Sequence, residues 1–321
     1  MSSPHKSITL ASVAVLSWST VATSFKIAQR ELTVYEMVLI AALTALGVFA
    51  VWLTVRGKWR SLDLLSPRTW LSFALLGLVN PVIYYLTLFR AYALLPAQIA
   101  QPINYIWPIL LLVLLAVFTG VPIQPRKYIG MAISLGGLTL ISYGGNAING
   151  SISVLGIVWA LLSALLWGIY WMMNDRLKDK ADEDVSLFIG FLFGTIYLLA
   201  GVAAATLFAP AGTDEIWGIP TLQSLSFNTA GILSGMYIGL FEMGIPFLCF
   251  GMAIRMTTNP ALINQMCYLA PFLSLFFISM ILGEPIVATT YTGLILIIAG
   301  IAYNEYFAGR RKRHKIRPQV K

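Results

Sequence analysis

Residues 118–123 read FTGVPI and residues 281–286 read ILGEPI, so one pattern returns 163 positions later in the chain. The same offset joins further pairs of identical residues: Tyr128 and Tyr291, Gly130 and Gly293, Gly137 and Gly300, and Tyr143 and Tyr306. Trp18 and Trp167 form another pair, at an offset of 149. Self-similarity of this kind predicts two copies of one structural unit.

The composition decides the class of protein. Apolar residues make up 58% of the 321 residues and charged residues only 11%, whereas soluble domains carry about 25% charged residues. The mean hydropathy is +0.81. A single core cannot bury this much apolar surface. We therefore exclude a soluble enzyme, a nucleic-acid-binding protein and a disordered chain, and we predict an all-α integral membrane protein in a lipid bilayer.

The apolar runs are long enough to define individual spans, since a transmembrane helix needs about 20 mostly apolar residues. The turn-forming sequence GGNAINGS at 144–151 divides one overlong run into two helices. We predict ten helices, at residues 8–27, 34–55, 69–92, 96–119, 126–144, 152–175, 185–208, 227–254, 259–282 and 286–307.

The basic residues orient these spans. With the N-terminus in the cytoplasm, 18 Lys and Arg residues fall on the inner side and 3 on the outer side, as the positive-inside rule requires. Seven of them lie in the last twelve residues. The net charge of +8 is therefore a topology signal rather than a nucleic-acid-binding surface. We expect a membrane protein with both termini in the cytoplasm.

Each half contains five helices. Because five is an odd number, the second half enters the membrane from the opposite side and has the opposite orientation. We expect a first repeat at 1–145, a periplasmic linker at 146–151, an inverted second repeat at 152–307 and a basic cytoplasmic tail at 308–321. Inverted repeats are typical of secondary transporters, which bind substrate between the halves and expose it to each side in turn. A duplication that serves only packing is the alternative. A monomer suffices for either.

The repeat carries a resemblance to a known family. The second half combines Asn259-Pro260-Ala261, Pro271 and Leu282-Gly283-Glu284-Pro285, and it resembles the EamA type of the drug/metabolite transporter superfamily. The first half has Val121 where that pattern has Glu. The resemblance implies ten spans in two inverted repeats and secondary transport. The aromatic content is most similar to bacterial aromatic amino acid exporters, which implies export.

Polar and aromatic residues within the spans mark candidate sites, because polar groups are costly in the membrane. Stripes on the fourth and ninth helices predict two walls of a central cavity, with interhelical hydrogen bonding as the alternative. Mid-span aromatics can stack on rings or hold an ammonium group. The predicted substrate-binding residues are Trp18, Pro81, Tyr84, Tyr85, Gln101, Asn104, Tyr105, Trp107, Trp167, Trp171, Gln265 and Tyr268.

Glu242 is the only acid well inside a predicted span. It is a candidate for proton coupling or for contact with an ammonium group, and a packed structural acid is the alternative. Cys249 and Cys267 lie in apolar runs without metal spacing, and His5 and His314 lie near the ends of the chain. We therefore expect no metal, no cofactor and no catalytic centre.

The leading hypothesis from the sequence is an amino acid exporter that prefers aromatic and other neutral side chains. The small multidrug transporters of the superfamily carry an acid in their first helix, whereas the first helix here has none. Efflux of drugs or quaternary cations, with Glu242 as the proton or cation site, is the alternative. The sequence leaves open whether transport is coupled to protons.

The predicted topology is testable by cysteine labelling with a membrane-impermeant reagent. Single cysteines at Asn146 and Asp214 should react from the outside of intact cells. Cysteines at Lys58 and Lys178 should react only after the inner side is exposed. Labelling of position 58 from outside would contradict the ten-span arrangement.

Overall fold

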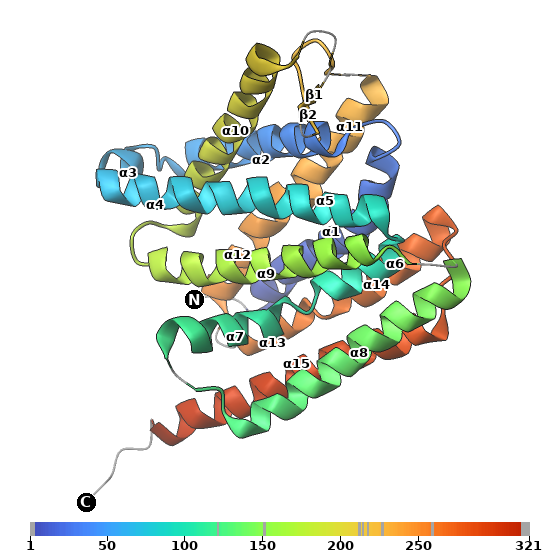
Figure 1. Cartoon of the computed structure of the whole chain (residues 1–321). Helices are drawn as coiled ribbons and strands as arrows, with labels where there is room; N and C mark the ends of the chain where they lie inside the picture. Colours follow the sequence, from blue (N-terminus) through green and yellow to red (C-terminus); the bar gives the residue numbers. More distant parts are fainter. Residues whose placement is uncertain are drawn as a thin grey trace, which may run out of the picture.

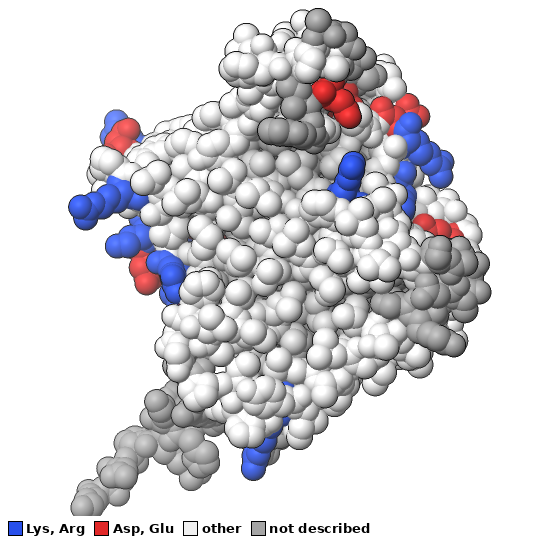
Figure 2. Space-filling model, in the orientation of Figure 1, with Lys and Arg blue, Asp and Glu red and all other residues white. Residues whose placement is uncertain are grey.

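The computed structural model describes residues 4–120, 122–149, 152–210, 213, 215–216, 218–225, 228–257 and 260–315. These residues form an all-α bundle whose long helices run side by side (Figure 1). The surface in Figure 2 is free of charge across the middle, and the charged side chains gather towards the two ends of the helices. This distribution is that of a membrane protein, because charged groups are excluded from the hydrocarbon core.

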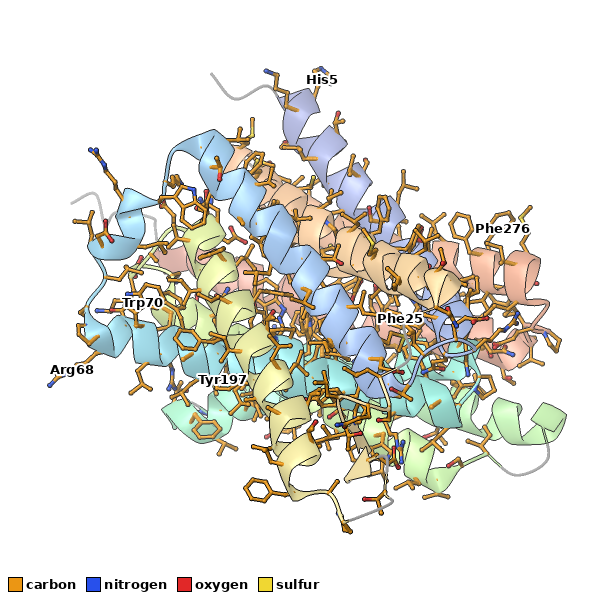
Figure 3. All side chains as sticks on the ribbon, turned by 90° about the horizontal axis from the view of Figure 1, so that it is seen from above. His5, Phe25, Arg68, Trp70, Tyr197 and Phe276 are labelled. Atoms are coloured by element: carbon orange, nitrogen blue, oxygen red, sulfur yellow. The ribbon has the colours of Figure 1, made fainter. Side chains whose placement is uncertain are left out.

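Seven helices of the described chain are long and apolar enough to cross a membrane. They are His5–Ala28, Val34–Arg56, Pro67–Leu94, Ala97–Thr119, Val154–Leu177, Glu183–Phe208 and Thr229–Met256. Two shorter apolar helices, Leu269–Leu282 and Ala288–Asn304, add to these. The side chains of the bundle interdigitate between the helices in Figure 3, where Phe25 lies inside and Phe276 at the edge.

The first half contains nine helical elements among the described residues. These are α1 (Pro4–Ala28), α2 (Val34–Arg56), α3 (Arg60–Asp63), α4 (Pro67–Gly77), the π-helix η1 (Leu78–Ile83), α5 (Tyr84–Leu94), α6 (Ala97–Asn104), α7 (Trp107–Thr119) and α8 (Pro125–Asn149). Sequence signals set their ends. Thr33 and Glu36 form a capping box at the start of α2, and Gly57 ends it at φ 62°, a conformation that glycine adopts without strain.

The second half follows the same order. Its described elements are α9 (Val154–Leu177), α10 (Glu183–Phe208), a two-stranded hairpin of β1 (Glu215–Ile216) and β2 (Ile219–Pro220), α11 (Thr229–Ile238), the π-helix η2 (Gly239–Gly244), α12 (Ile245–Met256), α13 (Pro260–Met266), α14 (Leu269–Phe277), the π-helix η3 (Ile278–Leu282) and α15 (Ala288–Lys315). The hairpin lies in the segment predicted to connect the seventh and eighth spans. Grouped across their interruptions, the described elements form ten helical segments in the predicted order, and α8 is the segment beyond the nine apolar helices named above.

Several predicted helices are interrupted. The fourth span divides into α6 and α7, the eighth contains η2, and the ninth divides into α13 and α14. Pro108, Pro246 and Pro271 each lie in the first turn of the helix that follows the interruption. A proline in the first turn has no intrahelical hydrogen bond to lose, whereas in a helix interior it costs about 3 kcal/mol. The chain therefore starts a new helix at each of these three prolines.

Two helix ends differ from the prediction. Helix α8 continues to Asn149, although 146–151 is predicted to be a linker. Helix α15 continues to Lys315, into the segment predicted to be a tail. Glycine lowers helix propensity by about 1 kcal/mol but does not block a helix. The pair of glycines at 144–145 is therefore a weaker stop signal than it seems from the sequence.

The contact between α8 and α15 shows how the two halves are related. These helices lie side by side (Figure 1) and meet backbone to backbone at two pairs of glycines. A Cβ on Gly130 would lie 2.5 Å from the Gly300 carbonyl oxygen, and one on Gly137 would lie 2.4 Å from that of Gly293. Gly130 corresponds to Gly293 and Gly137 to Gly300 at the offset of 163. When each residue is replaced by its counterpart in the other half, the contact of Gly130 with Gly300 therefore becomes the contact of Gly293 with Gly137.

Ser134 lies between these glycines and places the symmetry axis. Its hydroxyl donates to the backbone oxygen of Ile297 at 3.0 Å, and the two residues are 163 positions apart. Corresponding residues touch each other only where a two-fold axis passes between them. Other pairs agree: α1 packs on α12, as α9 packs on α5. The two halves are therefore inverted copies of one unit.

The glycine contact makes a prediction about stability. Gly137→Ala places a methyl group against the backbone of α15, so it should lower the free energy of unfolding by about 1–3 kcal/mol. Gly136→Ala is the matched control, because a Cβ there has nothing within 4 Å. The control should be neutral or stabilising, since alanine favours a helix. Thermal unfolding in detergent measures both variants, and equal melting temperatures would contradict the packing argument.

Candidate functional site

A cavity of about 600 Å³ lies between the two halves. It extends from Glu242 and Gln101 to Thr119, Asp175 and Arg176, which lie at the ends of α7 and α9. We call this end of the bundle the basic face, since Arg56, Lys58, Arg176 and Arg255 lie at the helix ends there. The size is that of a small-molecule site.

Most of the predicted site residues meet in this cavity. Its lining includes Trp18, Tyr84, Gln101, Asn104, Tyr105, Trp107, Trp167, Trp171, Glu242 and Tyr268. These residues come from α1, α5, α6, α7, α9 and η2 and from the junctions beside α6 and α14. The repeat pattern and the mid-span aromatics therefore identified residues that the fold brings together from distant parts of the sequence.

Glu242 is buried in η2, and its side chain has one hydrogen-bond partner among the described residues. The Tyr85 hydroxyl donates to Glu242 Oε1 at 3.0 Å, so Tyr85 supports the carboxylate from behind the cavity wall. The other lining carboxylate in the described chain is Asp175, which is exposed and forms a 2.8 Å ion pair with Lys178. Glu242 is thus the one buried acid among the described lining residues.

Trp18 is fixed by an interaction with the backbone. Its indole Nε1 donates to the main-chain oxygen of Glu242 at 3.2 Å. Pro246 lies four residues after Glu242 and has no N–H with which to pair this oxygen. The tryptophan replaces the missing donor. Its ring also contacts Phe247 and Phe250 edge-on, with centroids 6.2 Å and 5.4 Å away.

Trp167 belongs to the same aromatic lining. Its ring lies against Tyr84 at 4.6 Å and stacks on Tyr170 at 5.2 Å. It also contacts Phe247 at 5.9 Å. Because Trp18 contacts the same phenylalanine, the ring of Phe247 connects the two matched tryptophans. Aromatic pairs in this range of separations contribute about 0.5–1.5 kcal/mol each beyond burial.

Polar groups complete the lining. The Asn104 amide donates to Ser163 Oγ at 2.9 Å, which holds α6 against α9. The Gln101 Oε1 acceptor and the Trp171 Nε1 donor are buried and have no hydrogen-bond partner among the described residues. A buried polar atom without a partner costs about 1–3 kcal/mol. A ligand that supplies a donor to Gln101 and an acceptor to Trp171 would recover this cost.

Three predicted residues lie outside the lining of this cavity. Pro81 packs its ring against Gly194 of α10, and Tyr85 lies behind Glu242. Gln265 is exposed, whereas its counterpart Gln101 is buried. The cavity borders Gln101 but not Gln265, so equivalent positions in the two halves have different surroundings. The two polar stripes therefore do not form facing walls.

The sequence analysis missed Phe247 and Phe250, which both line the cavity. A signal was present for Phe250 alone, because Glu242, Phe250 and Ile254 lie at multiples of four residues on one helix face. In the part of the chain that the structure describes, no group of three His, Cys, Asp or Glu residues is placed to hold a metal ion.

Comparison with known proteins supports the same architecture. The EamA-like transporter family matches residues 5–143 and 154–304. An uncharacterized transporter of Bacillus subtilis, YvbV, is 23% identical over 234 residues, which cover 73% of this chain and 71% of that protein. The uncharacterized inner membrane transporter YedA of Escherichia coli is 22% identical over 182 residues, or 57% of this chain and 53% of that protein.

A solved crystal structure shares the fold, with a TM-score of 0.62 and 21% sequence identity over 96% of this chain and 99% of that chain. The two matched segments together cover most of the chain, one in each five-span half. This protein is a membrane transporter and not an enzyme, and it belongs to the EamA-like transporter family.

Proposed function

We propose that this transporter exports amino acids, with a preference for aromatic and other neutral side chains, by alternating access of its two inverted halves. The observation that supports the proposal is the pairing of aromatic walls with one unpartnered acceptor and one unpartnered donor. Gln101 Oε1 is available to an ammonium group and Trp171 Nε1 to a carboxylate. Trp18 and Trp167 contribute aromatic rings to the lining that a planar side chain would contact.

The charge of the substrate limits the alternatives. An amino acid enters as a zwitterion, and each of its charged groups needs a partner once water is removed. Polar but uncharged partners suit a substrate with no net charge, because they leave no buried countercharge when the site is empty. Transport down a concentration gradient then needs no coupling ion. Export rather than import rests on the family resemblance.

Efflux of drugs or quaternary cations is the second candidate, and a specific observation favours it. Glu242 is buried at the inner part of the cavity, whereas the basic lining residue among those described, Arg176, lies at the mouth. A cation surrounded by aromatic rings gains about 0.5–2 kcal/mol from each cation–π contact. Under this alternative Glu242 binds either the cation or the proton that is exchanged for it.

We also propose that the protein resides in the bacterial inner membrane with the basic face and both termini in the cytoplasm. The asymmetric distribution of Lys and Arg supports this orientation, and one relative carries the description inner membrane transporter. The cavity then opens to the cytoplasm, where an exporter loads its substrate.

The first test is counterflow in proteoliposomes with phenylalanine, threonine, alanine and a quaternary amine as substrates. Trp167→Leu should reduce phenylalanine flux about two- to tenfold more than alanine flux, which corresponds to a stacking gain of about 0.5–1.5 kcal/mol. Trp18→Leu should do the same and should also lower stability, because the Glu242 carbonyl loses its donor.

Trp70→Leu is the control, since Trp70 lies outside the cavity lining and packs on Phe193. It should affect all substrates alike or not at all. Flux is compared per folded molecule. Equal losses for every amino acid in Trp167→Leu would remove the aromatic preference. Flux of the quaternary amine alone would exclude amino acids as substrates.

Glu242→Gln separates the two candidates. If the substrate is a neutral zwitterion, counterflow should stay within about twofold of the unmodified protein, and a pH gradient should stimulate neither. If the substrate is a cation, counterflow of the quaternary amine should fall more than tenfold, because a buried cation loses its countercharge. Tyr85→Phe is the control, since it removes only the hydrogen bond to the carboxylate.

A further inference from the structure

The end of the bundle opposite the basic face is closed by a polar cluster that we call the latch, formed by Lys26, Gln98 and Glu284. Lys26 lies in the last turn of α1 and Gln98 in the first turn of α6, so both belong to the first half. Glu284 precedes α15 and belongs to the second half. All three border a separate cavity of about 390 Å³.

Glu284 caps a helix of the other half. Its Oε1 accepts from the backbone N–H of Ala97 at 3.3 Å, and its Oε2 accepts from that of Gln98 at 3.4 Å. The first N–H groups of a helix have no intrahelical partner, and they favour a negative charge. The side-chain amide of Gln98 in turn donates a hydrogen bond to the backbone oxygen of Pro285 at 2.8 Å. Thr290 of α15 donates to Gln98 Oε1 at 3.5 Å. The two halves are thus joined by four hydrogen bonds here.

Lys26 holds the preceding helix end. Its ammonium donates to the Leu95 oxygen at 2.7 Å and also to the Tyr92 oxygen. The last carbonyl groups of a helix lack partners and favour a positive charge. Lys26 therefore ties the end of α5 to α1, beside the helix start that Glu284 caps. Tyr92 and Phe25 line the main cavity just below this cluster.

The sequence repeat shows that the basic face has no equivalent of the latch. The residue that corresponds to Glu284 is Val121, at the offset of 163, and the residue that corresponds to Lys26 is Asp175, at the offset of 149. A valine side chain accepts no hydrogen bond in any position. An aspartate cannot donate to helix carbonyls. When the carrier turns over, the basic face must therefore close without these contacts.

We propose that Glu284 and Lys26 determine the resting conformation of the transporter. They hold the face opposite the basic face closed, so that without substrate the cavity is open at the basic face. The asymmetry between the halves, not their similarity, sets this preference. The inference is independent of the substrate and of the amino acid proposal.

The ion pairs at the basic face do not replace the latch. Lys58 pairs with Asp182 at 2.6 Å and with Asp184 at 3.0 Å, and this joins the end of α2 to the start of α10. None of these three residues lines the main cavity. Burial alone would lower the pKa of Lys58, but hydrogen bonds to the two carboxylates outweigh it and raise the pKa. The pair therefore stays charged near neutral pH, in the conformation in which the cavity is open.

The test is side-specific labelling of Cys267, which lines the main cavity, in a Cys249→Ser background. A membrane-impermeant maleimide is applied to right-side-out cells and to inside-out vesicles. The parent protein should label from the side of the basic face. Glu284→Gln should speed labelling from the opposite side about tenfold and slow it from the basic face. A tenfold change corresponds to about 1.4 kcal/mol between the two conformations.

Val121→Glu is the converse variant, because it supplies the basic face with the missing carboxylate. It should slow labelling from the basic face about tenfold, and combining it with Glu284→Gln should slow it further. Arg30→Gln is the control: this exposed charged residue follows α1 on the same face as the latch, and among the described residues it forms no hydrogen bond or ion pair with the second half. It should label as the parent does.

The proposal is overturned if Glu284→Gln leaves both labelling rates within twofold of the parent while the protein stays monodisperse in detergent. It is also overturned if Val121→Glu folds and labels from the basic face at the parent rate. If Val121→Glu fails to fold, Lys26→Met replaces it. Removing the ammonium should shift labelling in the same direction as Glu284→Gln.

Discussion

Prolines within membrane helices leave carbonyl groups without a backbone donor, and the hydrocarbon core holds no water to replace it. Pro246 leaves the main-chain oxygen of Glu242 without a backbone donor, and the indole N–H of Trp18 from the other half donates to it instead. This single bond fixes a cavity-lining ring, joins α1 to η2 and holds the buried acid in place. The cavity exists where it does because the chain must satisfy interrupted helices from inside the protein.

Pro108 and Pro271 have the same consequence in the fourth and ninth spans. Each starts a new helix, and the junctions before them carry Asn104, Tyr105 and Tyr268 into the cavity lining. In a continuous helix the backbone N–H and C=O groups are paired within the helix, so only side chains face the cavity. An interrupted helix in the middle of the bundle therefore gives a transporter a polar surface that the membrane tolerates, because it faces the cavity.

The sequence predicted the architecture well because its signals are repeated. The offset of 163 appears in Gly130, Gly137 and their partners, and an odd number of helices in each half requires inversion. The interruptions at 105–106 and 267–268 were not predicted, because the apolar pattern continues across them. Gln265 lies outside the lining for a different reason. A sequence repeat shows only what the two halves have in common. In any one conformation of an alternating-access transporter, equivalent residues of the two halves have different surroundings.

The same limit applies to the lining. Trp18 and Trp167 were predicted as a pair from their matching positions, and both reach the cavity. Phe247 was missed, because nothing in its local pattern shows that a ring from α12 lies between them. Side chains that meet through tertiary packing leave no periodic trace in the sequence. Such residues become visible only when the helices are assembled.

The contact between α8 and α15 also ties the histories of the two repeats together. After a gene duplication, each copy is usually free to vary on its own. Here Gly130 faces Gly300 and Gly137 faces Gly293 across the axis, so a side chain gained in one copy meets the backbone of the other. No compensating change within the same copy can make room for it. The two halves can diverge in the residues that line the cavity and in those that form the latch. Along the contact between α8 and α15, however, they have to vary together.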